Sequence, residues 1–264
     1  MRLVSAAVLL AIILATLWAL PPWATAVLAA IAACAAAGEV AGMAAHAGAR
    51  VSRAFVGVAA AAVSIALLAS AIGASADPLA VVLLTLIVAG GAMTLIHGPD
   101  AATFTRAATV TMAPVYVGLP LGVIAWVQYV HGPAATTWLL VMIAVSDSAQ
   151  YYCGRTFGRR KLAPSVSPAK TVEGAVGGVA VAAIVGAATV SIALPGVSMA
   201  AGGLLTLALA LAGIVGDLFE SLLKRSVGVK DSSALIPGHG GILDRIDSHL
   251  FAAPVFYLFL RFLA

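Results

Sequence analysis

Long runs of apolar residues, interrupted by very few charges, constrain this chain more than any other feature. Of its 264 residues, 62% are hydrophobic and 9% are charged, which lies far outside the range of soluble globular domains. A helix needs about 20 apolar residues to cross a bilayer core of about 30 Å. Such runs occur at 3–20, 23–40, 54–73, 79–97, 108–130, 135–152, 174–194, 198–220 and 248–263. The sequence therefore predicts an all-α, polytopic integral membrane protein with about nine transmembrane helices in a lipid bilayer.

The placement of Lys and Arg predicts how these helices are oriented, because cytoplasmic loops collect basic residues. Basic residues fall in alternate connections, and the connections between them are short and carry neither Lys nor Arg. Arg261, at the end of the last run, departs from this pattern. We expect a multi-pass protein of the inner (cytoplasmic) membrane. Its N-terminus and two polar loops, 153–173 and 221–247, would lie in the cytoplasm, where the two loops can close over one site.

The segment 221–247 concentrates ionisable residues in a chain that otherwise carries few. Charged groups at the middle of a bilayer cost on the order of 3 kcal/mol each, so these side chains must meet water, one another or a ligand. Five polar residues around its start have helical spacing and would form one stripe if the preceding helix continues: Asp217, Glu220, Ser221, Lys224 and Arg225. We expect this stripe to face a cavity and not lipid.

A glycine-rich turn in the same segment indicates anion binding. Three glycines lie within residues 238–241, whereas an ordinary connecting turn would use one. Without side chains, their backbone N–H groups can approach a phosphate closely. His239 within the turn can donate a hydrogen bond or shuttle a proton, although it also fits a solvent-exposed loop residue. Lys230 and Arg245 flank the turn and favour an anionic ligand.

An acidic pair follows this turn. Asp244 and Asp247 are three residues apart just before the last apolar run, so their carboxylates would share a face at the start of a helix. Mg2+ suits such ligands, because it is usually held by one or two carboxylates together with substrate phosphates and water. Asp217, from the end of the preceding apolar run, can complete the cluster. Acids also stabilise a helix N-terminus without any metal, which is the structural alternative.

The order S-x-x-K-R, K-D, H-G-G and D-R-x-D closely resembles the signature of the CDP-diacylglycerol synthases, also called phosphatidate cytidylyltransferases. So many fixed polar positions make this resemblance far more specific than a single glycine motif. The positions are Ser221, Lys224, Arg225, Lys230, Asp231, His239, Gly240, Gly241, Asp244, Arg245 and Asp247.

A second segment, Ser167 to Gly174, resembles the pattern S-P-x-K-T-x-E-G of the same family. Its matching polar residues are Ser167, Lys170, Thr171 and Glu173. Ser followed by Pro would also suit the start of a helix without any role in binding. Asp147, near the cytoplasmic end of the sixth run, falls where the family carries an acid.

The resemblance implies transfer of CMP from CTP to phosphatidate, giving CDP-diacylglycerol and pyrophosphate in phospholipid biosynthesis. Mg2+ is the expected cofactor, with a second cation left open, and a homodimer is implied by resemblance only. With the residue patterns, it assigns catalysis to Asp217, Lys224, Arg225, Lys230, Asp231, His239 and Arg245. Substrate binding is assigned to Asp147, Ser167, Lys170, Thr171, Glu173, Ser221, Gly240 and Gly241, and the metal to Asp217, Asp244 and Asp247.

Two regions are expected on this basis. Residues 1–130 would form an N-terminal transmembrane scaffold, and residues 131–264 a transmembrane catalytic region that includes both polar loops. Arg2, the apolar run after it and the sequence Ala-Thr-Ala at 24–26 imitate a signal peptide, but we expect this segment to be retained as the first helix. Glu39, near the end of an apolar run, fits either a functional site or a carboxylate that reaches water at a helix end.

Two other functions would share some of these features. A membrane CTP-dependent transferase acting on another lipid phosphate or a polyprenol would share these motifs. An anion transporter would also carry polar residues facing a cavity, but its charges would be expected nearer the midplane. Nucleic-acid binding is not expected, because the basic residues are few and are interrupted by acids. The sequence contains neither a Walker loop nor a dinucleotide-binding glycine motif.

Overall fold

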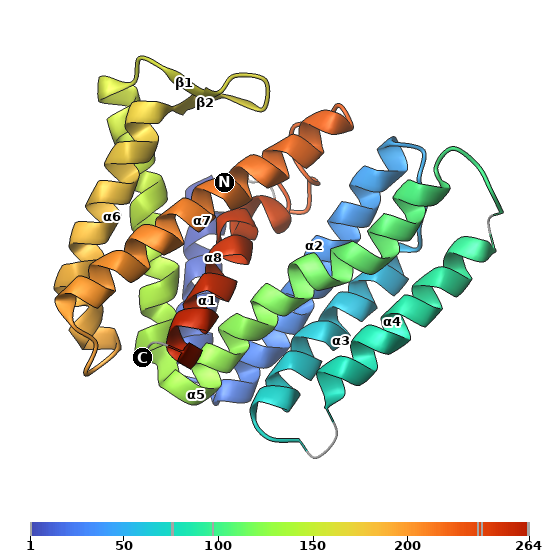
Figure 1. The fold of residues 1–264 in the computed structure, drawn as a ribbon, viewed down its shortest axis with the longest axis horizontal. Helices are drawn as coiled ribbons and strands as arrows, with labels where there is room; N and C mark the ends of the chain where they lie inside the picture. Colours follow the sequence, from blue (N-terminus) through green and yellow to red (C-terminus); the bar gives the residue numbers. More distant parts are fainter. Residues whose placement is uncertain (1, 75–76, 97, 237, 239, 263–264) are drawn as a thin grey trace. The chain divides into compact units, whose positions relative to one another are not determined.

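The computed structural model describes residues 2–74, 77–96, 98–236, 238 and 240–262, and it is predominantly helical (Figure 1). The all-α prediction is therefore confirmed at the level of fold class, with one small β-hairpin added. The elements, in order, are α1 (Arg2–Trp18), α2 (Pro22–His46), α3 (Arg53–Ala71), α4 (Pro78–Leu95), α5 (Thr103–Phe157), β1 (Lys161–Ala163), β2 (Ser167–Thr171), α6 (Val172–Ala193), α7 (Met199–Ser226) and α8 (Leu243–Phe262).

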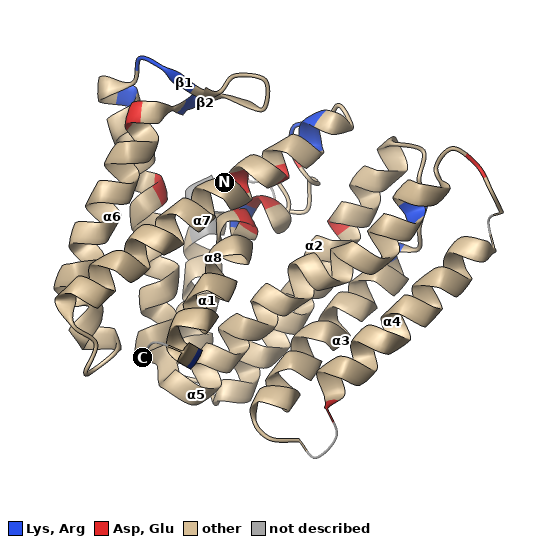
Figure 2. Ribbon diagram, viewed as in Figure 1, with Lys and Arg blue, Asp and Glu red and all other residues tan. Residues whose placement is uncertain are grey.

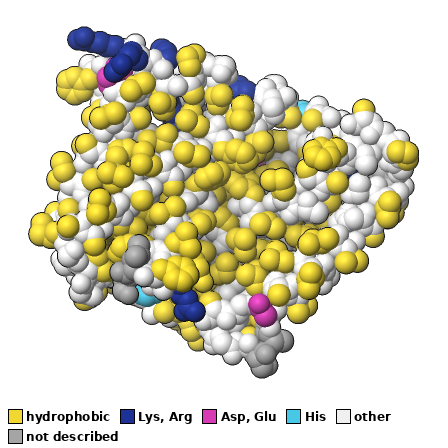
Figure 3. Space-filling model, viewed as in Figure 1, with side chains coloured by type: hydrophobic (Ala, Val, Ile, Leu, Met, Phe, Trp, Pro, Cys, Tyr) yellow, Lys and Arg dark blue, Asp and Glu magenta, His cyan; other side chains and the backbone are white. Residues whose placement is uncertain are grey.

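Within the described residues, six helices, α2 to α7, are long and apolar enough to cross a membrane. Hydrophobic side chains are spread over the face seen in Figure 3, and large ones on α4, such as Val88 and Leu95, are highly exposed. Figure 2 shows long helical stretches without a charged residue, with charges gathered near helix ends and in loops. These features are those of a multi-pass membrane protein. The finer expectation of about nine spans stays a prediction.

Helix α5 covers two of the predicted apolar runs, 108–130 and 135–152. Its 55 residues would extend about 80 Å as one straight helix, far more than one bilayer crossing needs. The helix is broken at Gly132, which has φ 81° and ψ −177°, a conformation that is essentially restricted to glycine. Pro133 follows and has no N–H to donate, which weakens helical hydrogen bonding at the same place.

The chain divides into two compact units. The first comprises Met1–Val130 and Ser226–Ile246, and the second comprises His131–Arg225 and Asp247–Ala264. Most of the polar segment 221–247, namely residues 226–246, thus groups with the N-terminal helices, whereas the sequence predicts that it belongs to the C-terminal region. The roles assigned to residues 1–130 and 131–264 stay predictions.

In the first unit, glycines let helices approach one another closely. A side chain at Gly57 on α3 would meet the backbone oxygen and the sulfur of Cys34 on α2 at 2.7 and 2.9 Å. A side chain at Gly122 on α5 would similarly meet the backbone oxygen of Ser64 on α3 at 2.7 Å. Small residues at such crossings are typical of membrane helices, whose association depends on close packing because lipid is as apolar as their side chains.

The second unit is packed in the same way. Gly186 on α6 faces Thr206 on α7 with no space for a further carbon atom. Gly216 on α7 faces the backbone oxygen of Asp247 on α8, which a side chain there would meet at 2.5 Å. The side chains of Phe219 and Phe251 pack beside this contact, with ring centroids 5.5 Å apart. These close contacts hold α7 against α6 and α8, and α7 and α8 carry several of the predicted site residues.

Candidate functional site

The predicted segment Ser167–Gly174 forms β2 and the first turn of α6. Strand β2 pairs with β1 in an antiparallel hairpin, with Lys161 opposite Thr171 and Ala163 opposite Ser167. Thr171, not Ser167, caps α6, and its hydroxyl accepts a hydrogen bond from the N–H of Gly174 at 3.1 Å. The alternative in which Ser167 and the following proline begin a helix is therefore wrong, because these residues are extended in the strand.

Glu173 fixes the turn that leads into this hairpin. Its carboxylate accepts hydrogen bonds from the backbone N–H groups of Arg159 and Arg160 at 3.0 and 3.1 Å. The guanidinium Nε of Arg160 also lies 3.3 Å from Glu173 Oε1. The carboxylate is thus engaged with its own loop, and its predicted contact with substrate stays a prediction.

Lys170, at the end of β2, connects the hairpin to α7. Its ammonium lies 2.5 Å from Asp217 Oδ2, and both side chains are partly exposed. This ion pair joins a residue of the first polar segment, 153–173, to the polar stripe of α7, which begins at Asp217. Because both side chains are partly exposed, an anion can approach Lys170 and a cation can approach Asp217.

Three carboxylates of the second unit, Asp147, Asp217 and Asp247, interact electrostatically with one another and are called here the acidic cluster. Asp147 on α5 interacts electrostatically with Lys170 and Asp217, and accepts a hydrogen bond from Gln150 Nε2 at 3.2 Å. Asp247 on α8 interacts electrostatically with Asp217, Asp147 and Lys224. Like charges repel, so a shared cation would stabilise this arrangement.

Helix α7 continues through Ser226, which confirms that the predicted polar stripe is helical. Ser221 Oγ lies 3.4 Å from Asp217 Oδ1. Lys224 Nζ lies 2.5 Å from Glu220 Oε2 one turn away, and the side chains of this pair are 11% and 1% exposed, respectively. Arg225, in contrast, is exposed. The stripe thus combines a buried ion pair, which the sequence did not distinguish, with accessible groups on either side.

The segment that connects α7 to α8, residues 227–242, is called here the motif loop and belongs to the first unit. Lys230 and Asp231 near its start are exposed. At its end, Gly240 adopts φ 81°, and its backbone oxygen accepts a hydrogen bond from the N–H of Ile236 at 2.8 Å. Pro237 and His239 lie outside the described residues, so the predicted role of His239 stays a prediction.

Asp244, in the first turn of α8, holds the motif loop closed. Its Oδ2 accepts hydrogen bonds from Ser232 N at 3.0 Å, Ser232 Oγ at 2.8 Å and Gly241 N at 2.7 Å. The N–H of Gly241, expected to approach a phosphate, is therefore directed at a carboxylate. Arg245 is exposed, and its N–H donates to Ile242 O at 2.9 Å.

The fit of Mg2+ to these residues depends on the acidic cluster. Among the described residues, no three or more His, Cys, Asp or Glu side chains are gathered as a ready-made metal site. Mg2+ does not require one, because it is commonly held by one or two carboxylates completed by substrate phosphates and water. Asp217 and Asp247 supply such oxygens within one unit. Asp244 differs from them, because its Oδ2 is engaged in the motif loop.

Three residues that organise this region were missed by the sequence analysis as members of the site. Glu39 on α2 accepts hydrogen bonds from the motif loop, and its partners include the hydroxyl groups of Ser232 and Ser233. Glu39 stood out in the sequence as an acid in an apolar run, and that signal could have identified it. Nothing in the sequence distinguished the two serines from ordinary loop residues.

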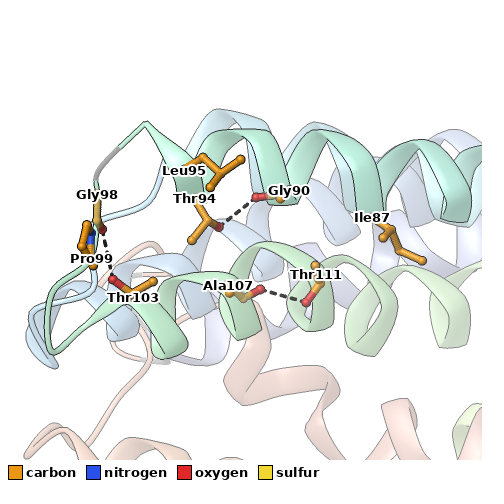
Figure 4. Close-up of a pocket in the computed structure, with 10 residues that line it drawn as sticks. Ile87, Gly90, Thr94, Leu95, Gly98, Pro99, Thr103, Ala107 and Thr111 are labelled. Carbon is orange, nitrogen blue, oxygen red and sulfur yellow. Dashed lines mark hydrogen bonds between the residues drawn. The ribbon is translucent and has the colours of Figure 1, made fainter.

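A separate groove of about 610 Å³ lies between α4 and the start of α5 (Figure 4). Its threonine hydroxyls bond to nearby backbone oxygens: Thr94 to Gly90, Thr103 to Gly98 and Thr111 to Ala107. The lining is therefore largely apolar and includes none of the predicted site residues.

The chain is similar in sequence to known proteins. The model of the cytidylyltransferase family matches residues 1–263. The chain is 39% identical over 160 residues to a phosphatidate cytidylyltransferase of Bacillus subtilis, covering 60% of each chain. It is 43% identical over 136 residues to a phosphatidate cytidylyltransferase of Haemophilus influenzae, covering 50% of this chain and 47% of that protein.

It is also 43% identical over 131 residues to the uncharacterized protein YnbB of Escherichia coli, covering 50% of this chain and 44% of that protein. The chain thus spans about half the length of the curated relatives that it matches, from 44% to 60% for these three. The family model, in contrast, extends over nearly every residue. This chain belongs to the cytidylyltransferase family.

Proposed function

We propose that this protein transfers the CMP unit of CTP to phosphatidate, giving CDP-diacylglycerol and pyrophosphate. The observation that carries the proposal is the Lys170–Asp217 ion pair, which joins a residue predicted to bind substrate to one predicted to act in catalysis and to hold the metal. Around it lie two further carboxylates and Lys224. Membership of the cytidylyltransferase family supports this chemistry.

Charge is the main obstacle to this reaction, because both substrates are polyanions. Lys170 and Lys224 of the second unit, together with Arg225, supply positive groups that can orient phosphates. In the proposal, Asp217 and Asp247 hold Mg2+, with Asp147 as the third member of the acidic cluster. When bound, Mg2+ supplies charge stabilisation at the α-phosphate and at the departing pyrophosphate.

The nucleophile in this proposal is the phosphate of phosphatidate. A phosphate monoester has a second pKa near ~6, so it is already largely dianionic at neutral pH and needs no dedicated base. The residues therefore bind and align the two phosphates for in-line attack, and no nucleophilic triad is required. The acyl chains would remain in the bilayer beside the apolar helices while the head group reaches the charged site. We place this site on the cytoplasmic side of the inner membrane and include a homodimer in the proposal.

Pyrophosphate release from purified full-length protein in detergent is the direct test. We expect release only when CTP, phosphatidate and Mg2+ are all present. Removal of Mg2+ with EDTA should abolish release, and added Mg2+ should restore it, because the acidic cluster would otherwise repel the triphosphate. The lipid product should be CDP-diacylglycerol by mass spectrometry.

Two substitutions of substrate make this test specific. Diacylglycerol lacks the attacking phosphate and should give no release, and ATP should replace CTP poorly. Release with another lipid phosphate but not with phosphatidate would overturn the substrate assignment. Absence of release with every lipid phosphate and CTP would overturn the enzymatic proposal and favour the alternative of an anion transporter.

A further inference from the structure

The carboxylate of Glu39 accepts four hydrogen bonds from the motif loop and the start of α8. Its Oε1 accepts from Ser233 Oγ at 2.7 Å and from Ile242 N at 3.0 Å. Its Oε2 accepts from Ser232 Oγ at 2.9 Å and from Leu243 N at 2.9 Å. Glu39 itself is only 7% exposed. Hydrogen bonds to an ionised acceptor are roughly twice as strong as neutral ones, so this is a strong attachment.

Three of the four donors lie in the motif loop, in both of its arms, and the fourth, Leu243, is the first residue of α8. Ser232 and Ser233 directly follow the predicted residues Lys230 and Asp231. The other two donors, at residues 242 and 243, lie between the glycine turn and Arg245. A single side chain from α2 therefore fixes the separation of two arms that both carry predicted site residues. The two backbone donors also belong to the start of α8, where N–H groups lack helical partners and a negative charge is favourable.

Ser232 extends this attachment to Asp244. Its hydroxyl lies 2.9 Å from Glu39 Oε2 and 2.8 Å from Asp244 Oδ2, although a hydroxyl has only one proton to share between them. Gly241 lies against Ser232 and Glu39, because a side chain at position 241 would overlap both Ser232 Oγ and Glu39 Oε2. The requirement for glycine at 241 thus follows from the close approach of two carboxylates and a serine.

We propose that Glu39 is a positioning residue for cytidylyl transfer, which holds both arms of the motif loop so that Lys230, Asp231 and Arg245 keep one arrangement. Glu39 acts through the loop and does not contact the reacting atoms. This inference rests on the proposed function, because the loop residues would act on the substrates of that reaction. Groups held in advance in a productive geometry avoid ordering costs during the reaction, and small displacements of them lower rates strongly.

Glu39→Gln is the sharpest variant, because it keeps the size of the side chain but replaces one acceptor oxygen by an NH2 donor. That NH2 would face a backbone N–H, either at Ile242 or at Leu243, which cannot reverse its role. We expect kcat/KM for pyrophosphate release to fall by about 10- to 100-fold, the range seen when groups that orient a site are removed. Hydrogen exchange in the peptide covering 230–245 should become about tenfold faster without any substrate.

Asp77→Asn is the matched control. Like Glu39, Asp77 is an acid of the first unit that accepts a backbone N–H at the start of a helix, in its case that of Ala80 at 3.3 Å. It should leave both readouts unchanged. If Glu39→Gln folds poorly, Ser233→Ala removes one donor of the four and should give a smaller change of the same kind.

Gly241→Ala provides a separate test that leaves every charge in place. The added methyl group would displace Ser232 and Glu39, so we expect the same faster exchange and a lower kcat/KM. The measurement is the same peptide-resolved exchange and pyrophosphate assay, made on protein that elutes as a single folded species.

The outcomes separate the two proposals. Glu39→Gln protein with lower thermal stability but wild-type kcat and KM would overturn the positioning role, and unchanged hydrogen exchange would overturn the attachment itself. Wild-type protein that releases no pyrophosphate would overturn the proposed function. In that case the exchange measurement would still report on the attachment, because it requires no substrate.

Discussion

Asp217→Asn is expected to lower the rate of pyrophosphate release by about 100-fold or more, while the protein stays folded. The substitution preserves the shape of the side chain but removes the charge that pairs with Lys170 at 2.5 Å and that would bind Mg2+. The Mg2+ concentration required for half-maximal rate should rise as well. The measurement is a Mg2+ titration of pyrophosphate release at saturating CTP, on variant and wild-type protein of equal folded fraction.

Asp100→Asn is the control for this experiment. Asp100 also forms a short ion pair, 2.6 Å from Arg106 Nη2, but lies in the connection between α4 and α5, away from the predicted site residues in the sequence. The hydrogen bond from Arg106 holds the pKa of Asp100 below its ordinary value, so this acid is charged at neutral pH. An Asp217→Asn variant that is as active as Asp100→Asn would contradict the metal and catalytic roles of Asp217.

Lys224→Met is expected to destabilise the protein by about 3–5 kcal/mol, because removing one partner of a buried ion pair leaves the other charge poorly compensated. Glu220, the partner, has a side chain only 1% exposed. The expected result is a clear decrease in the thermal unfolding temperature in detergent, followed by tryptophan fluorescence.

The double variant Glu220→Gln with Lys224→Met separates the two roles of Lys224. Removing both charges should restore most of the lost stability, because no buried charge is then left without its partner. Activity should remain low if Lys224 also orients phosphate, as proposed. Recovery of wild-type activity together with stability would show that Lys224 has a structural role alone.

The fold was predictable where a residue that can cap a helix precedes an apolar run. The predicted runs 54–73 and 79–97 correspond closely to α3 and α4, because Ser52 and Asp77 cap the first turns of these helices with their side chains. The hairpin of β1 and β2 was missed. Its strands have three and five residues, and the backbone before it is held by Glu173, which lies beyond the second strand.

Within the candidate site, the motifs identified the residues but not how each is used. Asp244 and Asp247 looked equivalent by spacing, yet Asp244 accepts three hydrogen bonds from the motif loop, while Asp247 interacts with the acidic cluster. The contribution of Glu39 was not predictable from local patterns, because its partners lie 193 to 204 residues further along the chain. Only the folded chain brings such distant residues together.

The long sequence separation between Glu39 and its partners also has a consequence for biogenesis. Leu243 follows Glu39 by 204 residues. At translation rates of about 5–20 residues per second, the donors emerge roughly 10 to 40 s after the carboxylate. An acid without partners is expensive in hydrocarbon, so the end of α2 that carries Glu39 must stay at the aqueous boundary while the later helices are inserted. The motif loop can therefore lock into place only as one of the last steps of assembly.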